Sequence, residues 1–108
     1  MDYRSLGSLQ VSVIGLGCNN FGMKIDADAT KAVVDAAIDA GINYFDTAES
    51  YGRGKSEEFL GQALGSRRSE VLVASKWGHD MSLAEGERGG DPAQVRARLE
   101  ASLKRLGT

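Results

Sequence analysis

Residues 41–64, GINYFDTAESYGRGKSEEFLGQAL, hold a short apolar run, a polar turn and an amphipathic stretch, in that order. The apolar run from Ile42 to Phe45 ends at Asp46, which predicts a buried strand. Apolar side chains then recur at helical spacing up to Gly65, which predicts a helix with a buried stripe of Phe59, Leu60, Ala63 and Leu64. A buried strand followed by such a helix is the repeating unit of an α/β protein.

A similar unit precedes this stretch. Residues 3–10 predict a small hairpin, and the apolar residues of 11–16 predict a buried strand. Residues 29–40 predict a helix with Asp28 as its N-cap and Gly41 as the left-handed residue that ends it. We expect the buried stripe of this helix to consist of Ala29, Ala32, Val33, Ala36, Ala37 and Ala40.

A third unit follows. Residues 71–74 predict a strand, and a last helix begins with Asp91 as N-cap and Pro92 at the first helical position and stops at Gly107. Its expected buried stripe is Val95, Leu99, Leu103 and Leu106. Its expected solvated face is Arg96, Arg98, Lys104 and Arg105. Residues 77–90 form a connection longer than most in compact domains. Three strand–helix units predict a parallel sheet with right-handed crossovers.

The composition narrows the range of partners. The 108 residues fit one small domain, and 13 basic against 15 acidic side chains leave a net charge of −2, too little positive charge to hold a nucleic acid. No apolar run approaches the roughly 18 residues that a membrane span requires. The one cysteine cannot form an intramolecular disulfide, so we expect a cytoplasmic protein. The sequence predicts no metal site.

Chemically useful side chains follow the expected strands. The first strand leads to Cys18, Asn19 and Asn20, the second leads to Asp46 and Tyr51, and the third leads to Lys76 and Trp77. Because ligands bind at the carboxyl ends of parallel strands, we expect a carboxylate, a phenol and an amine to meet at one rim.

These three groups predict acid catalysis. A phenol donates its proton poorly at neutral pH, and an adjacent ammonium favours its ionised form, so Tyr51 beside Lys76 can act as a general acid. An Asp46 carboxylate would keep Lys76 charged and oriented. The glycines of GLGCNNFG, residues 15–22, also suggest a dinucleotide fingerprint, but Asn20 occupies its third glycine position.

The same residues resemble a known family. Residues 41–64 closely resemble the signature of the aldo-keto reductases, and VLVASKWG (71–78) resembles their lysine-bearing third strand. Residues 3–22 look like the family's N-terminal hairpin and first strand, and residues 99–107 look like the helix before its fourth strand. The resemblance implies an α/β fold, the (β/α)8 TIM barrel. Residues 1–108 would be its incomplete N-terminal portion, a hairpin and about three βα units.

The resemblance also implies an activity. Aldo-keto reductases are oxidoreductases that reduce aldehydes or ketones to alcohols with NADPH or NADH, and Asp46, Tyr51 and Lys76 match three members of their catalytic tetrad. The proton donor would be Tyr51. The implied cofactor-binding residues are Gly17, Cys18, Asn19 and Asp46. The implied substrate pocket contains Asn20, Phe21 and Trp77.

The fourth member of the tetrad is a histidine on the next strand, which the 108 residues do not contain. His79 lies on the long connection and is expected to be a solvated loop residue. We therefore expect the isolated 108 residues to be inactive, and whether the natural chain continues past Thr108 and supplies this histidine stays open. The substrate, the choice between NADPH and NADH, and the oligomeric state stay open.

Two alternatives remain. One is a non-catalytic relative that binds nucleotide or a protein partner and regulates it. The other is a self-contained three-stranded module, whose two unpaired strand edges would favour self-association.

Overall fold

A computed structural model describes residues 1–78 and 85–108 of the chain. It begins with an antiparallel hairpin of β1 (Tyr3–Leu6) and β2 (Leu9–Ser12). The strand–helix units are β3 (Leu16–Gly17) with α1 (Ala27–Asp39), β4 (Tyr44–Asp46) with α2 (Lys55–Leu64), and β5 (Leu72–Ala74) with α3 (Pro92–Leu106). Short 3-10 helices, η1 (Tyr51–Gly54) and η2 (Gly65–Glu70), flank α2. The predicted order of elements is confirmed.

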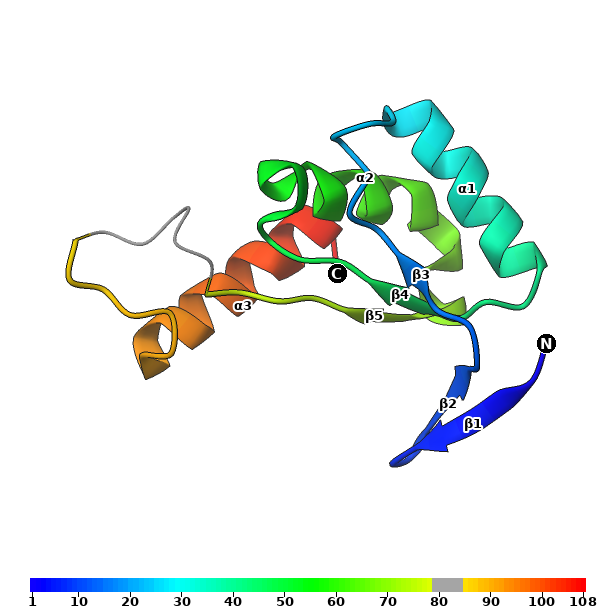
Figure 1. The fold of residues 1–108 in the computed structure, drawn as a ribbon, viewed down its shortest axis with the longest axis horizontal. Coiled ribbons are helices and arrows are strands. Elements are labelled where there is room, and N and C mark those ends of the chain that lie inside the picture. Colours follow the sequence, from blue (N-terminus) through cyan, green and yellow to red (C-terminus); the bar gives the residue numbers. More distant parts are fainter. Residues whose placement is uncertain (79–84) are drawn as a thin grey trace.

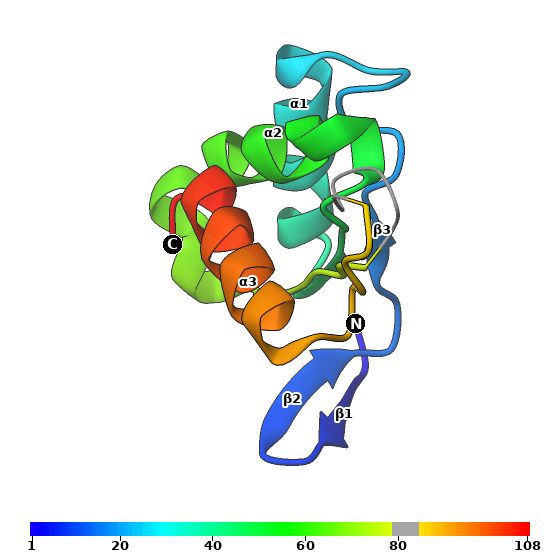
Figure 2. The same ribbon diagram turned by 90° about the vertical axis from the view of Figure 1, so that its left-hand side faces the viewer.

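The three strands after the hairpin form one parallel sheet in the order β3-β4-β5, as predicted. Within the described residues, the α-helices lie on one face of this sheet, and α2 packs between α1 and α3 (Figures 1 and 2). Gly61 permits the close approach of α2 to α3, because a Cβ there would lie 2.4 Å from the carbonyl oxygen of Leu106. The hairpin stands apart from the helices, beside the start of β3 (Figure 1).

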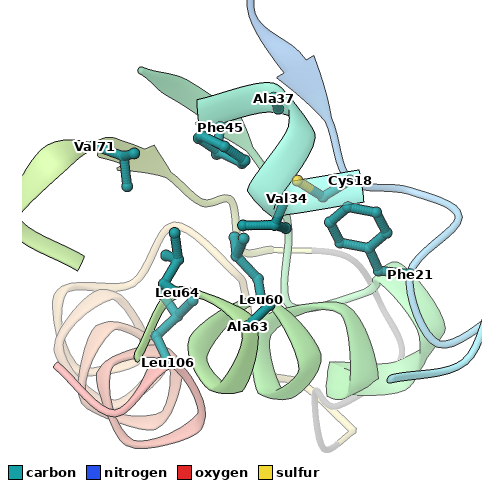
Figure 3. Packing of buried hydrophobic residues seen from close by; sticks show 10 residues of the cluster. All are labelled: Cys18, Phe21, Val34, Ala37, Phe45, Leu60, Ala63, Leu64, Val71 and Leu106. Carbon is teal, nitrogen blue, oxygen red and sulfur yellow. The ribbon is translucent and has the colours of Figure 1, made fainter. Parts of the chain in front are cut away.

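The core lies between the sheet and the helices (Figure 3). The alternation of side chains along β4 turns Phe45 toward the helices, where it is fully buried with Leu60 of α2 and Val34 of α1. The buried cluster consists of Cys18, Phe21, Val34, Ala37, Phe45, Leu60, Ala63, Leu64, Val71 and Leu106. Most of these side chains come from α1, α2 and the strands. These elements therefore supply most of the buried apolar side chains.

The predicted N-cap of α1 is wrong, and its predicted stripe is confirmed only at Ala37. Asp26, not Asp28, is the N-cap, and its carboxylate accepts a hydrogen bond of 2.9 Å from the amide of Ala29. The buried face is Thr30, Val34 and Ala37, while Val33 is 39% exposed. Alanines occur all around this helix and mark no face, so the larger Val34 and Ile38 decide which side is buried. Gly41 has the predicted positive φ, 89°.

The predicted buried strand at residues 11–16 is also wrong. The hairpin is longer than expected, because Ser12 pairs with Tyr3. Val13 and Ile14 follow the hairpin and are exposed, and β3 begins only at Leu16. The side chain of Asn43 holds the hairpin in place, since it accepts from the amide of Ser12 at 2.8 Å and donates to the carbonyl of Gln10 at 2.9 Å.

The predicted faces of α3 need correction. Of the expected stripe, only Leu106 is buried, while Leu99 is 58% and Leu103 38% exposed. Arg105 does not belong to a solvated face, because it pairs with the buried Glu57 of α2. Pro92 begins the helix and Gly107 ends it with φ 69°, as predicted, but Asp91 at the N-cap makes no capping hydrogen bond through its side chain.

Candidate functional site

The carboxyl ends of the three parallel strands bring the predicted amine and carboxylate together. Gly17 pairs with Asp46, and Asp46 pairs with Ala74 on the neighbouring strand. Lys76, two residues past the end of β5, reaches back over β4, where its Nζ donates to Asp46 Oδ1 at 2.6 Å and to the carbonyl of Thr47 at 3.0 Å. The predicted Asp46–Lys76 pair is therefore present.

Tyr51 joins this pair from the loop after β4. It is the first residue of η1, and its amide donates to the carbonyl of Ala48 at 3.2 Å. The Lys76 Nζ lies 5.1 Å from the centroid of the Tyr51 ring. A second backbone link, from the amide of Glu49 to the carbonyl of Lys76 at 3.0 Å, holds this loop against the end of β5. The structure thus brings Asp46, Tyr51 and Lys76 together, as the sequence predicts.

The charge of Lys76 is stabilised by its neighbours. Partial burial lowers the pKa of the amine, but the hydrogen bond and charge of Asp46, together with Tyr51, outweigh this and leave the pKa raised. The amine is therefore a cation at neutral pH. In this arrangement the phenol of Tyr51 is suited to donating a proton, because the Lys76 ammonium beside it favours the phenolate and Asp46 orients the ammonium.

The loop after β3 contains both exposed and buried residues. Gly17, Asn19 and Asn20 are exposed. Cys18 is fully buried and Phe21 is 3% exposed, and both side chains lie in the core (Figure 3). Burial raises the pKa of the Cys18 thiol to about 12, so the thiol stays neutral. At these two positions the side chains anchor the loop.

Trp77 borders an open hollow at the strand ends. The hollow has a volume of about 310 Å³ and is lined by Ala48, Glu49, Ser50, Tyr51, Lys76, Trp77 and Gly78. The indole is 49% exposed, and its Nε1 donates to the carbonyl of Gly89 at 2.7 Å. The proposed proton donor and the predicted pocket residue Trp77 therefore face the same space. His79 lies outside the described residues.

Sequence reasoning missed a polar cluster behind the strand ends. Ser56 and Glu57 of α2 are fully buried, and Glu57 is bonded to Ser75 and Arg105. A signal for it exists, because Glu57 lies three residues before Leu60 and seven before Leu64, on the apolar side of the helix. A carboxylate on such a face requires buried partners.

The comparison with known families decides the identity of the fold. A model of the aldo/keto reductase family matches residues 13–108. The chain belongs to the aldo-keto reductase family. Among the described residues, no helix is long and apolar enough to cross a membrane.

Two curated relatives are similar over the length of this chain. One, from Oryza sativa subsp. japonica, is named a probable voltage-gated potassium channel subunit beta and is 40% identical over 98% of this chain and 34% of its own length. The other, the uncharacterized oxidoreductase YqkF of Bacillus subtilis (strain 168), is 38% identical over 100% of this chain and 36% of its own length. The chain thus spans about a third of each relative.

A solved aldo-keto reductase has the same arrangement of elements. The holo form of an aldo-keto reductase from Bacillus halodurans matches with a TM-score of 0.84 and 36% identity, over 100% of this chain and 37% of that one. The hairpin and parallel sheet of residues 1–108 therefore correspond to part of the TIM barrel of the aldo-keto reductases, as the sequence predicts.

Proposed function

We propose that residues 1–108 form the N-terminal portion of an aldo-keto reductase barrel, and that the whole protein reduces aldehydes or ketones to alcohols with NADPH or NADH. The observation that carries this proposal is the Asp46–Lys76 pair beside the Tyr51 ring, at the carboxyl ends of a parallel sheet. The family's catalytic histidine lies on the fourth strand, which residues 1–108 do not include. The 108 residues alone would therefore be inactive.

In this mechanism the Tyr51 hydroxyl donates its proton to the carbonyl oxygen of the substrate. NADPH or NADH, when bound there, would be the source of the hydride that the carbonyl carbon receives. The Lys76 ammonium stabilises the phenolate that remains, and Asp46 holds the ammonium in place with a hydrogen bond of 2.6 Å. Solvent then returns a proton to Tyr51. The hollow beside Trp77 would receive the small carbonyl compound; Asn20 is not among the residues that line it, and the Phe21 side chain lies in the core instead.

The residues present fit the nicotinamide end of the cofactor. The exposed amide side chains of Asn19 and Asn20 suit hydrogen bonds to a carboxamide. A Cβ at Gly17 would meet no atom within 4 Å, so a flat ring has room to approach the loop closely. Asp46 would stand at the edge of this space, and Cys18 would contribute through its backbone, because its side chain is buried.

The proposal is tested by replacing the proton donor in the whole protein. Tyr51→Phe removes the hydroxyl and keeps the ring, and we expect it to lower kcat for an aromatic aldehyde by roughly a hundredfold or more. Tyr3→Phe is the matched control, since Tyr3 donates to the carbonyl of Gly41 in the hairpin region. Steady-state oxidation of NADPH measures both variants, and full activity of Tyr51→Phe would contradict the proposed acid role.

A regulatory function is the second candidate. It is favoured by the name of the rice relative, a channel subunit, which suggests a protein partner. The one tryptophan of the chain, Trp77, borders the hollow and reports on binding there. In the whole protein, quenching of the Trp77 fluorescence by NADPH without turnover of any aldehyde would favour this second function over the first.

Two further assignments are part of the proposal. The location would be the cytoplasm. Self-association would use the strand edges that β3 and β5 leave open within the described sheet, and sedimentation analysis of residues 1–108 would detect it.

A further inference from the structure

The first turn of α2 lies directly behind the strand ends and holds two of them through one serine. The hydroxyl of Ser56 is fully buried and donates to the carbonyl of Cys18, after β3, at 2.7 Å. Its single proton is used in that bond, so the hydroxyl of Thr47, after β4, donates to Ser56 Oγ at 2.9 Å. One side chain of α2 thus fixes the backbone after β3 and the residue next to Asp46.

The next residue of α2 holds the third strand end. The Glu57 side chain is fully buried, and its Oε1 accepts from the hydroxyl of Ser75, the residue before Lys76, at 2.5 Å. Its Oε2 accepts from Arg105 Nε of α3, also at 2.5 Å, and Arg105 donates further to the buried Ser102 at 3.3 Å. The carboxylate of α2 therefore links this helix to the end of β5 and to α3.

These contacts place an anchor next to each member of the Asp46–Lys76 pair. Thr47 follows Asp46 and is held by Ser56, and Ser75 precedes Lys76 and is held by Glu57. The Lys76 side chain is long and 50% exposed, so the geometry of its 2.6 Å hydrogen bond to Asp46 depends on how the two backbone segments lie relative to each other. Ser56 and Glu57 are consecutive residues of one helical turn, so the two anchors cannot move independently.

We propose that Ser56 and Glu57 are positioning residues that hold Asp46 and Lys76 in register for proton donation by Tyr51. The inference rests on the proposed function. Packing alone does not require a carboxylate here, because a buried ion pair is often no more stable than apolar residues of similar volume. What apolar residues could not supply is an acceptor for the hydroxyl of Ser75.

The test uses Ser75→Ala in the whole protein, because it removes the link to β5 while the Glu57–Arg105 pair stays intact. We expect kcat to fall about tenfold with KM unchanged. The pKa of the Lys76 amine, measured by NMR of labelled lysine, should fall toward its ordinary value of 10.5 as the amine moves away from Asp46. Ser75→Thr keeps the hydroxyl and should restore both quantities.

The matched control is Glu58→Gln, next to Glu57. Glu58 is 43% exposed and pairs only loosely with Lys55, at 3.7 Å, so its loss should change neither quantity. An unchanged kcat and an unchanged Lys76 pKa in Ser75→Ala would overturn the positioning role. The NMR measurement needs no turnover, so it tests this inference even where Tyr51→Phe keeps full activity and the proposed function fails.

Discussion

The helices α2 and α3 have similar apolar patterns but very different surroundings. In α2, Leu60 and Leu64 are almost completely buried against the sheet and α1. In α3, Leu99 and Leu103 are exposed and border a groove of about 210 Å³ between α3 and β5, together with Val73 and Val95. The periodicity of a helix therefore shows which face is apolar, and its neighbours decide whether that face is covered.

The polar contacts show the same contrast. The first turn of α2 contributes fully buried groups that are all paired with strand ends or with Arg105. In α3 only Ser102 and Leu106 are buried, and Arg105 links this helix to α2 through its ion pair with Glu57. We conclude that α2 organises this part of the barrel, and that α3 depends on α2 for its position.

The largest effect on stability is expected for Leu60→Ala. The side chain is fully buried at the centre of the cluster, so truncation removes apolar contacts and leaves a cavity, which costs about 2–5 kcal/mol. Urea unfolding followed by circular dichroism measures the change. A loss below about 1 kcal/mol would mean that α2 is not the centre of the core.

A smaller loss of stability is expected when the buried thiol of Cys18 ionises at high pH. Burial raises the pKa of Cys18 from 9.0 to about 12, so the folded chain keeps a proton that the unfolded chain loses. The resulting stability is present below pH 9 and is lost as the pH rises, by about 3 kcal/mol at pH 11. Lys76, whose pKa is also raised, acts in the same direction above its ordinary value.

Urea midpoints of the wild-type chain and of Cys18→Ala between pH 8 and pH 11 separate the two contributions. The loss with pH should be markedly smaller in Cys18→Ala, because only the lysine contribution remains. Parallel loss in both chains would show that the thiol ionises as easily when folded as when unfolded.

The sequence predicted the strand ends better than the surfaces. Asp46, Tyr51 and Lys76 could be placed together because the ends of parallel strands meet at one edge, whatever the packing of the helices. Residues 11–16 were misread because an apolar run does not reveal whether its strand pairs in a sheet core or in a hairpin. In α1, alanines lie all around the helix, so the pattern identifies the buried Ala37 but not the buried Thr30 and Val34.

Long-range polar pairs could not be predicted from local patterns. Arg105 lies 48 residues from Glu57, and its neighbours on α3 are charged, so a solvated face was the natural expectation. Only the packing of α2 against α3 reveals the partner. The position of Glu57 on the apolar side of its helix indicated that a partner was needed but not which residue supplies it.

The smallest effect on stability is expected for Leu99→Ser, on the exposed apolar face of α3. Because Leu99 is 58% exposed, this substitution should change the stability of residues 1–108 by no more than about 0.5 kcal/mol. If residues 1–108 are part of a longer barrel, further elements cover the groove beside β5, and the same substitution should cost about 2 kcal/mol or more in the whole protein. Urea unfolding of both lengths measures the difference. Equal costs would mean that the groove stays open, and the contrast between α2 and α3 would then belong to the whole protein as well.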